Sequence, residues 1–101
     1  MDGIDKLVAM VRHEVAEYVC PSPSATAYYV ENDEQRVFAV LSVPTKDSQK
    51  TSVMIMARIV ENLVLIESDK TNKPLCEALL QAGVPREQIV LVYEGEAPAT
   101  V

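Results

Sequence analysis

The stretch VENLVLIESDKTNKPLCEALLQAGVPREQIVL, residues 60–91, constrains the fold of this chain more than any other segment. Its apolar residues alternate as in a strand, stop at a polar bend, resume with helical spacing and end in another apolar run. Gly83 followed by Pro85 is typical of a helix end, because glycine accepts a left-handed backbone and proline cannot continue the helix. The segment therefore predicts a strand–helix–strand unit, in which the helix packs against a sheet.

The residues ahead of this unit predict one more helix and three more strands. Apolar residues recur at helical spacing until Pro21 and Pro23 end the pattern, and β-forming residues then alternate with period two. Glu61 and Asn62 fit a two-residue hairpin turn. The expected order is α-β-β-β-β-α-β: helix 4–19, strands 25–30, 36–43, 53–59 and 63–67, helix 75–82 and strand 89–93. This is an α+β fold, mainly antiparallel, with the helices packed on one face and the last strand parallel to the fourth, beside it or one strand away.

Composition limits the classes of function. The 101 residues suit a single domain, 1–101. The net charge is −6 and the nine basic residues are scattered, so direct nucleic-acid binding is not expected. An acidic domain suits a basic protein partner, although negative charge also serves solubility. Apolar runs are far shorter than the roughly 20 residues that cross a bilayer, and the N-terminus lacks signal-peptide features. We expect a cytoplasmic protein without membrane contact.

Apolar residues on both faces of the predicted strands indicate an interface. Two helices that cover one set of side chains leave another set over, and large exposed apolar patches mark interaction sites. We take the covered set to be Val37, Leu41, Ile55, Leu63 and Leu65. The second face would then carry Phe38, Val40, Met54, Met56, Val64 and Ile66. The first four are the predicted interface residues of a homodimer or an obligate complex. The alternative is a curled sheet that buries its own second face.

Candidate chemistry is confined to one corner of the sequence. Glu67 and Asp69 stand two apart at a strand end, with Thr71 just beyond them, and paired carboxylates can bind a metal or transfer protons. Acidic residues are, however, also favoured at a solvated turn before a helix. The single histidine, His13, lies one turn before Glu17, as a surface histidine does beside an acidic neighbour. No metal or cofactor is predicted.

Several motifs follow the pattern of a known family in register. The opening helix has Asp5, Lys6, Leu7 and Tyr18; the strand end has Ile66, Asp69 and Thr71; the closing motif has Gly83, Val84, Pro85, Arg86, Ile89, Val90 and Leu91. In these positions the chain resembles the XisI family, known as the fdxN element excision controlling factor proteins. Asn62, Leu63, Leu65 and Asn72 stand where the family has glycine, lysine, tryptophan and glutamate, so the chain is expected to be a divergent member.

The resemblance implies a non-enzymatic accessory factor. Such proteins look like partners of XisH-like proteins, which resemble nuclease-fold proteins, in the excision of DNA elements in cyanobacteria. Arg86, in the closing motif, joins Glu67, Asp69 and Thr71 as a candidate contact for a partner or ligand. Two alternatives remain open: a small ligand-binding, metal-binding or enzymatic domain that uses the Glu67–Asp69–Thr71 corner, and a stand-alone homo-oligomer without a role in excision.

Overall fold

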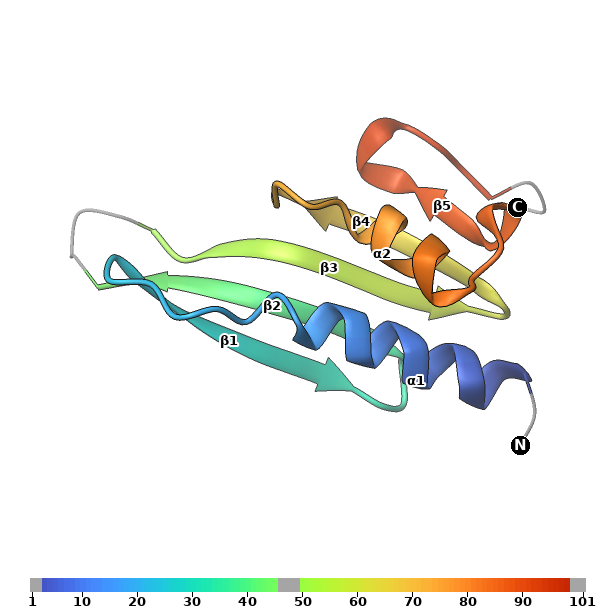
Figure 1. Ribbon diagram of the computed structural model, residues 1–101, viewed down its shortest axis with the longest axis horizontal. Helices are drawn as coiled ribbons and strands as arrows, with labels where there is room; N and C mark the ends of the chain where they lie inside the picture. Colours follow the sequence, from blue (N-terminus) through green and yellow to red (C-terminus); the bar gives the residue numbers. More distant parts are fainter. Residues whose placement is uncertain (1–2, 46–49, 99–101) are drawn as a thin grey trace.

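The computed structural model describes residues 3–45 and 50–98 and contains the expected order of elements. Two helices lie on one face of a five-stranded sheet, and the strands follow one another in chain order across it (Figure 1). The elements are α1 (Gly3–Ala16), β1 (Ala25–Asn32), β2 (Val37–Pro44), β3 (Ser52–Val60), β4 (Leu63–Asp69), α2 (Leu75–Ala82) and β5 (Ile89–Leu91), with short 3-10 helices η1 (Arg86–Gln88) and η2 (Val92–Glu94). The predicted α+β fold is confirmed.

The sheet is an antiparallel meander closed by one parallel strand. β1 to β4 pair antiparallel with their neighbours, and β5 pairs parallel with β4, with Ile89 opposite Val64. Because parallel neighbours need a long crossover, the chain passes through α2 between them. The last strand thus lies directly beside the fourth, which was one of the two expected arrangements.

One core lies between the helices and the sheet. α1 and α2 bury apolar stripes at helical spacing, and each strand contributes alternate side chains to the same layer. The helix residues are Leu7, Val11, Val15, Leu75, Cys76 and Leu79, and the central sheet residues are Phe38, Val40, Ile55, Ala57, Ile59, Val64, Ile66 and Ile89. Neither helix within the described residues is long and apolar enough to cross a membrane.

Two β-bulges set which side chains face the helices. Between β2 and β3, Val40 pairs with Ile55 and Leu41 with Val53, so Met54 has no partner on β2. A bulge adds one residue to one strand and changes the direction of the side chains that follow. Met54 and Ile55 therefore both contact the core, although they are adjacent in the chain.

The second bulge lies between β3 and β4. Ala57 pairs with Ile66 and Met56 with Ser68, which leaves Glu67 without a partner on β3. Beyond Glu67, the side chains of β4 again alternate between the two faces of the sheet, but shifted by one residue. Asp69 consequently turns toward the helices, whereas strict alternation would have placed it on the same side as Glu67.

The helix ends and turns follow the local chemistry of the sequence. Gly83 has φ +108° and ends α2, and its N–H donates to Leu80 O at 3.1 Å. Val84 N–H donates to Leu79 O at 3.0 Å, which completes the glycine helix end that the sequence predicts. In the predicted hairpin turn at residues 61–62, Glu61 has a positive φ of 56°.

Two element boundaries were predicted too far along the chain. α1 ends at Ala16, and the next turn is tighter: Tyr18 N–H donates to Val15 O at 3.1 Å and Val19 N–H to Ala16 O at 3.2 Å. The last strand ends at residue 91, where the 3-10 helix η2 begins and packs against β4. Apolar spacing continues through both places, so periodicity alone overestimates these elements.

An ion-pair cluster joins α1 to β1. Arg12 Nε and Nη2 donate to Glu31 at 2.9 and 2.7 Å, and Tyr29 Oη donates to the same carboxylate at 2.6 Å. The Arg12 hydrogen bonds lower the pKa of Glu31 to about 2. Asp33, 3.1 Å from Arg12, has a raised pKa because it lies beside the Glu31 carboxylate. The cluster holds the only charged residue of β1 in a fixed, neutralised position.

Candidate functional site

Asp69 organises the loop between β4 and α2. Its Oδ1 accepts hydrogen bonds from Thr71 N at 3.0 Å and Thr71 Oγ1 at 2.6 Å, and its Oδ2 accepts one from Leu75 N at 2.7 Å. The last contact satisfies an N–H in the first turn of α2, which begins after Pro74. Pro74 at the start of the helix makes no side-chain hydrogen bond, and Asp69 supplies the carboxylate from the strand end. Both of its oxygens are therefore engaged in holding the fold.

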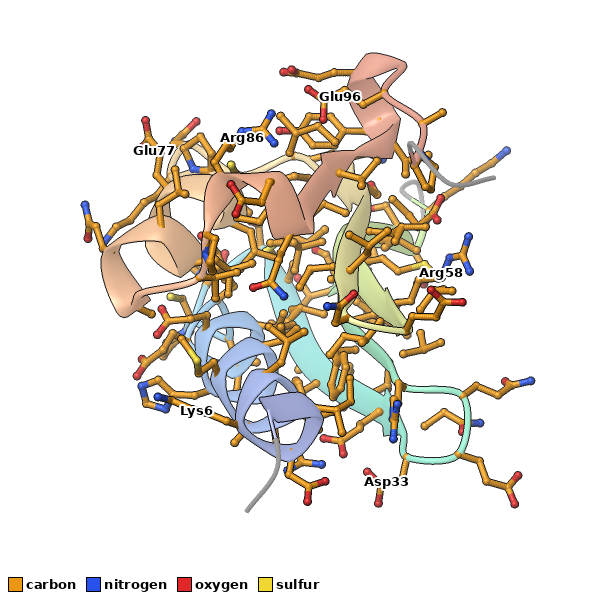
Figure 2. All side chains as sticks on the ribbon, turned by 90° about the vertical axis from the view of Figure 1, so that its right-hand side faces the viewer. Lys6, Asp33, Arg58, Glu77, Arg86 and Glu96 are labelled. Carbon is orange, nitrogen blue, oxygen red and sulfur yellow. The ribbon has the colours of Figure 1, made fainter. Side chains whose placement is uncertain are left out.

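Glu67 lies on the opposite side of the sheet from Asp69. It accepts a hydrogen bond from Arg58 Nε at 2.7 Å, and Figure 2 shows Arg58 on the side away from the helices. The structure brings Asp69 and Thr71 together but separates both from Glu67. The cause is the bulge at Glu67, which the residue pattern alone does not reveal. The three residues do not form one constellation, and no group of three metal-ligating side chains occurs among the described residues.

Arg86 fixes the segment after β5. Its Nη1 donates to Ile89 O at 2.7 Å and its Nη2 to Glu96 Oε2 at 2.9 Å. Glu96 Oε1 accepts from Leu91 N at 2.9 Å, and this bond is the main reason why the pKa of Glu96 is lowered. Arg86 and Glu96 lie side by side in Figure 2. Sequence reasoning treated Arg86 as a partner contact and missed its bond to Glu96, because the two residues lie ten positions apart with no periodic pattern between them.

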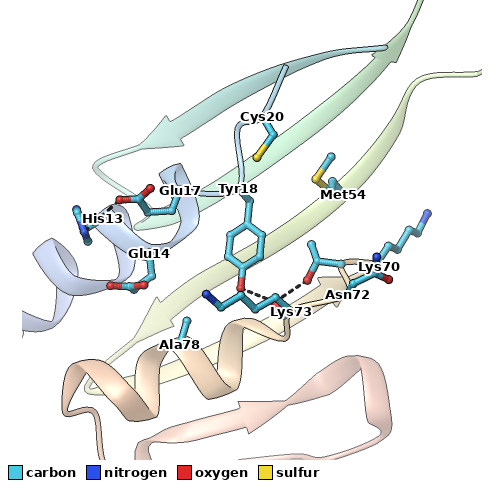
Figure 3. A pocket seen from close by; sticks show the side chains of 11 residues that line it. His13, Glu14, Glu17, Tyr18, Cys20, Met54, Lys70, Asn72, Lys73 and Ala78 are labelled. Carbon is cyan, nitrogen blue, oxygen red and sulfur yellow. Dashed lines mark hydrogen bonds and ion pairs between the residues drawn. The ribbon is translucent and has the colours of Figure 1, made fainter. Parts of the chain in front are cut away.

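A hollow of about 700 Å³ lies beside the Asp69 loop, between α1 and the start of α2 (Figure 3). Tyr18 stands in it and donates from Oη to Lys73 O at 2.5 Å. Burial, reinforced by the charge of Asp69, raises the pKa of Tyr18 to about 12. The remaining lining residues are His13, Glu14, Glu17, Cys20, Met54, Lys70, Thr71, Asn72 and Ala78. Within the described chain, every buried polar side-chain atom already has a hydrogen-bond partner, so the hollow presents no unpaired buried group to a ligand.

His13 contacts only one acidic neighbour in this region. Its Nε2 lies 3.5 Å from Glu17 Oε1, and both side chains are largely exposed. This is the surface arrangement that the sequence favoured. Cys20 is exposed and Cys76 is buried, each as a free thiol.

The second face of the sheet, which carries no helix among the described residues, is called here the helix-free face. Strand register and the two bulges assign side chains to it. These are Thr26, Tyr28, Val30, Asn32, Val37, Ala39, Leu41, Val43, Val53, Met56, Arg58, Val60, Leu63, Leu65, Glu67, Ser68 and Val90. Most are apolar, and the charged ones form the Arg58–Glu67 ion pair.

The predicted interface residues are partly corrected by this assignment. Phe38 and Val40 are fully buried in the core beneath the helices and cannot form an interface on the second face. Met54 also packs against the core, because the bulge turns it inward. Met56 does lie on the helix-free face, opposite Ala39. Some apolar side chains on that face are exposed and others, Ala39 among them, are buried, and β2 was assigned the wrong way round.

The same inversion applies to β4. Leu65 was expected beneath the helices and lies on the helix-free face, while Val64 and Ile66 are core residues. Both strands have apolar residues at successive positions, so alternation does not say which set turns inward. The distinction follows only from packing against α1 and α2.

The fold and these contacts define a small α+β domain in which the candidate polar side chains mainly support loops and chain ends. The family model described as XisI protein matches residues 1–99. The chain therefore belongs to the XisI family, as the sequence motifs predicted.

Two solved structures share this fold. A XisI-like protein from Anabaena variabilis ATCC 29413 is 20% identical, with a TM-score of 0.79 over 87% of this chain and 84% of that one. The fdxN element excision controlling factor XisI from the same organism is 18% identical, with a TM-score of 0.66 over 86% of each chain. No curated protein matches the sequence.

Proposed function

We propose that this protein is a non-enzymatic, cytoplasmic accessory factor that binds a XisH-like protein and through it takes part in controlling the excision of a DNA element. Family membership supports the class of function, since a solved relative is named an excision controlling factor. The observation that carries the proposal is the helix-free face. We infer that this face is the docking surface for the XisH-like partner.

The helix-free face has the composition of a protein interface. Tyr28 and Val30 remain 52% and 41% exposed on it, whereas Leu65 farther across the sheet is buried. Exposed apolar patches mark interaction sites. Arg58 and Glu67 neutralise each other on it, so docking would not bury an unpaired charge.

Charge supports a protein partner over DNA. The net charge is −6, and DNA binding depends largely on basic residues that neutralise phosphates. Of the nine basic residues, Arg12, Arg58 and Arg86 are already paired with carboxylates. An acidic domain attracts a basic protein surface and steers its approach. This complementarity favours a basic partner that itself contacts DNA.

The candidate polar groups also fit an accessory role. Asp69 supports the entry of α2, Glu67 pairs with Arg58, and Arg86 ties down the chain after β5. A catalytic carboxylate must be free to reach a substrate proton or a metal. These side chains are instead occupied by contacts within the fold, which favours the accessory role over the enzymatic alternative.

Co-expression tests the proposal. The chain is produced with the XisH-like protein encoded nearest to it, and the mass of the product is measured by light scattering. We expect a mixed complex that Met56→Lys on the helix-free face abolishes. Leu80→Lys is the matched control, because Leu80 is 40% exposed on α2, away from that face. A wild-type chain that stays alone beside the candidate, or a complex that Met56→Lys leaves intact, would contradict the proposed docking.

A further inference from the structure

β1 has an open edge. It pairs with β2 on one side, and within residues 3–45 and 50–98 no strand pairs with it on the other. α1 packs mainly over β2 and β3 and reaches β1 through the Arg12–Glu31 ion pair. A strand of eight residues thus presents a row of backbone groups to its surroundings.

The register shows which backbone groups point outward. Thr45 N–H donates to Ser24 O at 3.1 Å, which makes these opposed residues a hydrogen-bonded pair. Bonded and non-bonded pairs alternate along an antiparallel ladder. The next pair, Ala25 with Pro44, is therefore non-bonded, in agreement with the missing N–H of proline. By the same alternation, the N–H and C=O groups on the open edge belong to Ala25, Ala27, Tyr29 and Glu31.

This edge lacks two of the usual protections against pairing, and the third is neutralised. Natural edge strands are commonly blocked by lysine, proline or an inward charge, and β1 contains neither lysine nor proline. Its one charged residue, Glu31, is held by Arg12 and Tyr29 on the helix side of the sheet. The strand can therefore accept another strand without burying a free charge.

We propose that β1 pairs antiparallel with β1 of a second copy of this chain, about a two-fold axis at Tyr28, and joins the two sheets into one. The inference rests on the proposed function, because it assumes that the helix-free face is occupied by the XisH-like partner and is therefore not the dimer interface. It also replaces the expected face-to-face homodimer with one built edge to edge.

The sequence of β1 complements itself in this register. Residues opposite each other must point to the same face of the joined sheet. The two-fold axis must therefore pass at a residue and not between two neighbouring residues. With Tyr28 on the axis, Ala27 lies opposite Tyr29 of the second copy, and Ala25 lies opposite Glu31 of that copy. Every outward backbone group from residue 25 to residue 31 then has a partner, and like charges are not opposed. An axis at Tyr29 would leave the groups of Ala25 unpaired.

Side chains on the helix-free face also favour this register. The Tyr28 rings of the two copies meet in a non-bonded pair, where side chains approach most closely. Val30 lies opposite Thr26 of the second copy, and such β-branched pairs stabilise a sheet. Tyr28 and Val30 are exposed in the single chain. Pairing covers them and extends the apolar face across both copies.

Light scattering on the protein alone tests the pairing. Wild type should have twice the chain mass of 11.1 kDa. Ala27→Pro removes an N–H that points to the open edge and leaves the β1–β2 ladder intact, since proline is tolerated at such edge positions. We expect its mass to fall to that of one chain while its circular dichroism is unchanged. Met56→Lys, on the helix-free face, should stay dimeric. A monomeric wild type, or a dimer that Ala27→Pro preserves, overturns the proposal.

Amide hydrogen exchange on the wild type tests the same edge without a substitution. In the dimer, the amides of Ala27, Tyr29 and Glu31 should exchange as slowly as those of Tyr28 and Val30, which bond to β2. On an open edge the first three would exchange much faster, and that result refutes the pairing. The partner assay is independent. If Met56→Lys breaks both the dimer and the mixed complex, the edge inference fails and the docking proposal stands.

Discussion

Removal of the Asp69 carboxylate is the most informative stability experiment on this fold. Asp69→Ala deletes the acceptor of three hydrogen bonds, two from Thr71 and one from Leu75 N–H. The backbone N–H groups of Thr71 and Leu75 then have no side-chain acceptor. Because the carboxylate holds the entry of α2, its loss should loosen the helix as well as the loop.

The magnitude follows from these contacts. Loss of a helix-capping side chain costs about 1 kcal/mol, and a hydrogen bond to a charged group contributes about 1.5–3 kcal/mol where it is shielded from water. The site is only partly buried, so water replaces part of this interaction. We expect Asp69→Ala to lower the free energy of unfolding by about 2–3 kcal/mol. For a domain of this size that corresponds to a fall of roughly 10–20 °C in the melting temperature.

Urea unfolding followed by far-ultraviolet circular dichroism measures this loss, at one fixed protein concentration so that any dimer contributes equally. Glu67→Ala is the matched control, because Glu67 pairs with Arg58 at a partly exposed site. Such surface pairs contribute about 0–1 kcal/mol. Similar losses for the two variants, or a loss below about 0.5 kcal/mol for Asp69→Ala, would contradict the reasoning. Asp69 would then not hold the entry of α2 more firmly than Glu67 holds its surface ion pair.

Three further predictions test other parts of the fold. The pKa of Glu31 falls from 4.5 to about 2 on folding, so its contribution to stability is complete above pH 4.5 and is lost as the pH falls toward 2. Glu31→Gln should flatten the acid side of the stability–pH curve, and an unchanged curve contradicts this. Gly83→Ala should cost about 1–2 kcal/mol in thermal unfolding, because φ is +108° there with open space around it. Gly3→Ala, with equal space and no positive φ, is its control, and equal melting temperatures would count against the glycine helix end. Phe38→Ala should cost about 3–5 kcal/mol, against about 1 or less for Met56→Ala. A larger stability loss for Met56→Ala than for Phe38→Ala would indicate that Phe38 lies on the second face and not in the core.

The sequence could predict the elements because their signals are local. Helical spacing, the Gly83 helix end and the period-two strands each depend on residues close together in the chain. Their order then determines a meander with one crossover. What failed at the boundaries was also local: apolar spacing continued past Ala16, although the chain there tightens into a 3-10 turn.

The faces of the strands and the candidate site could not be predicted in the same way. Each bulge inserts one residue into the alternation, and no residue type in this sequence marks Met54 or Glu67 as the extra one. If side chains are assigned to faces by strict alternation along the strand, every residue beyond the bulge is placed on the wrong face of the sheet. For that reason Glu67 and Asp69 looked like a pair, while the structure places them on opposite faces.

The departures from the family pattern acquire a meaning once the faces are known. Leu63 and Leu65, which stand where the pattern has a lysine and a tryptophan, both belong to the helix-free face. Asp69 and Gly83, which follow the pattern, hold the loop and the end of α2. The retained residues thus serve the fold. Leu65 is buried, so of the two departures only Leu63 changes the surface proposed for docking. A partner surface shaped for a lysine would meet a leucine here, so we expect this chain to bind the XisH-like protein proposed as its partner more tightly than one that serves a typical family member.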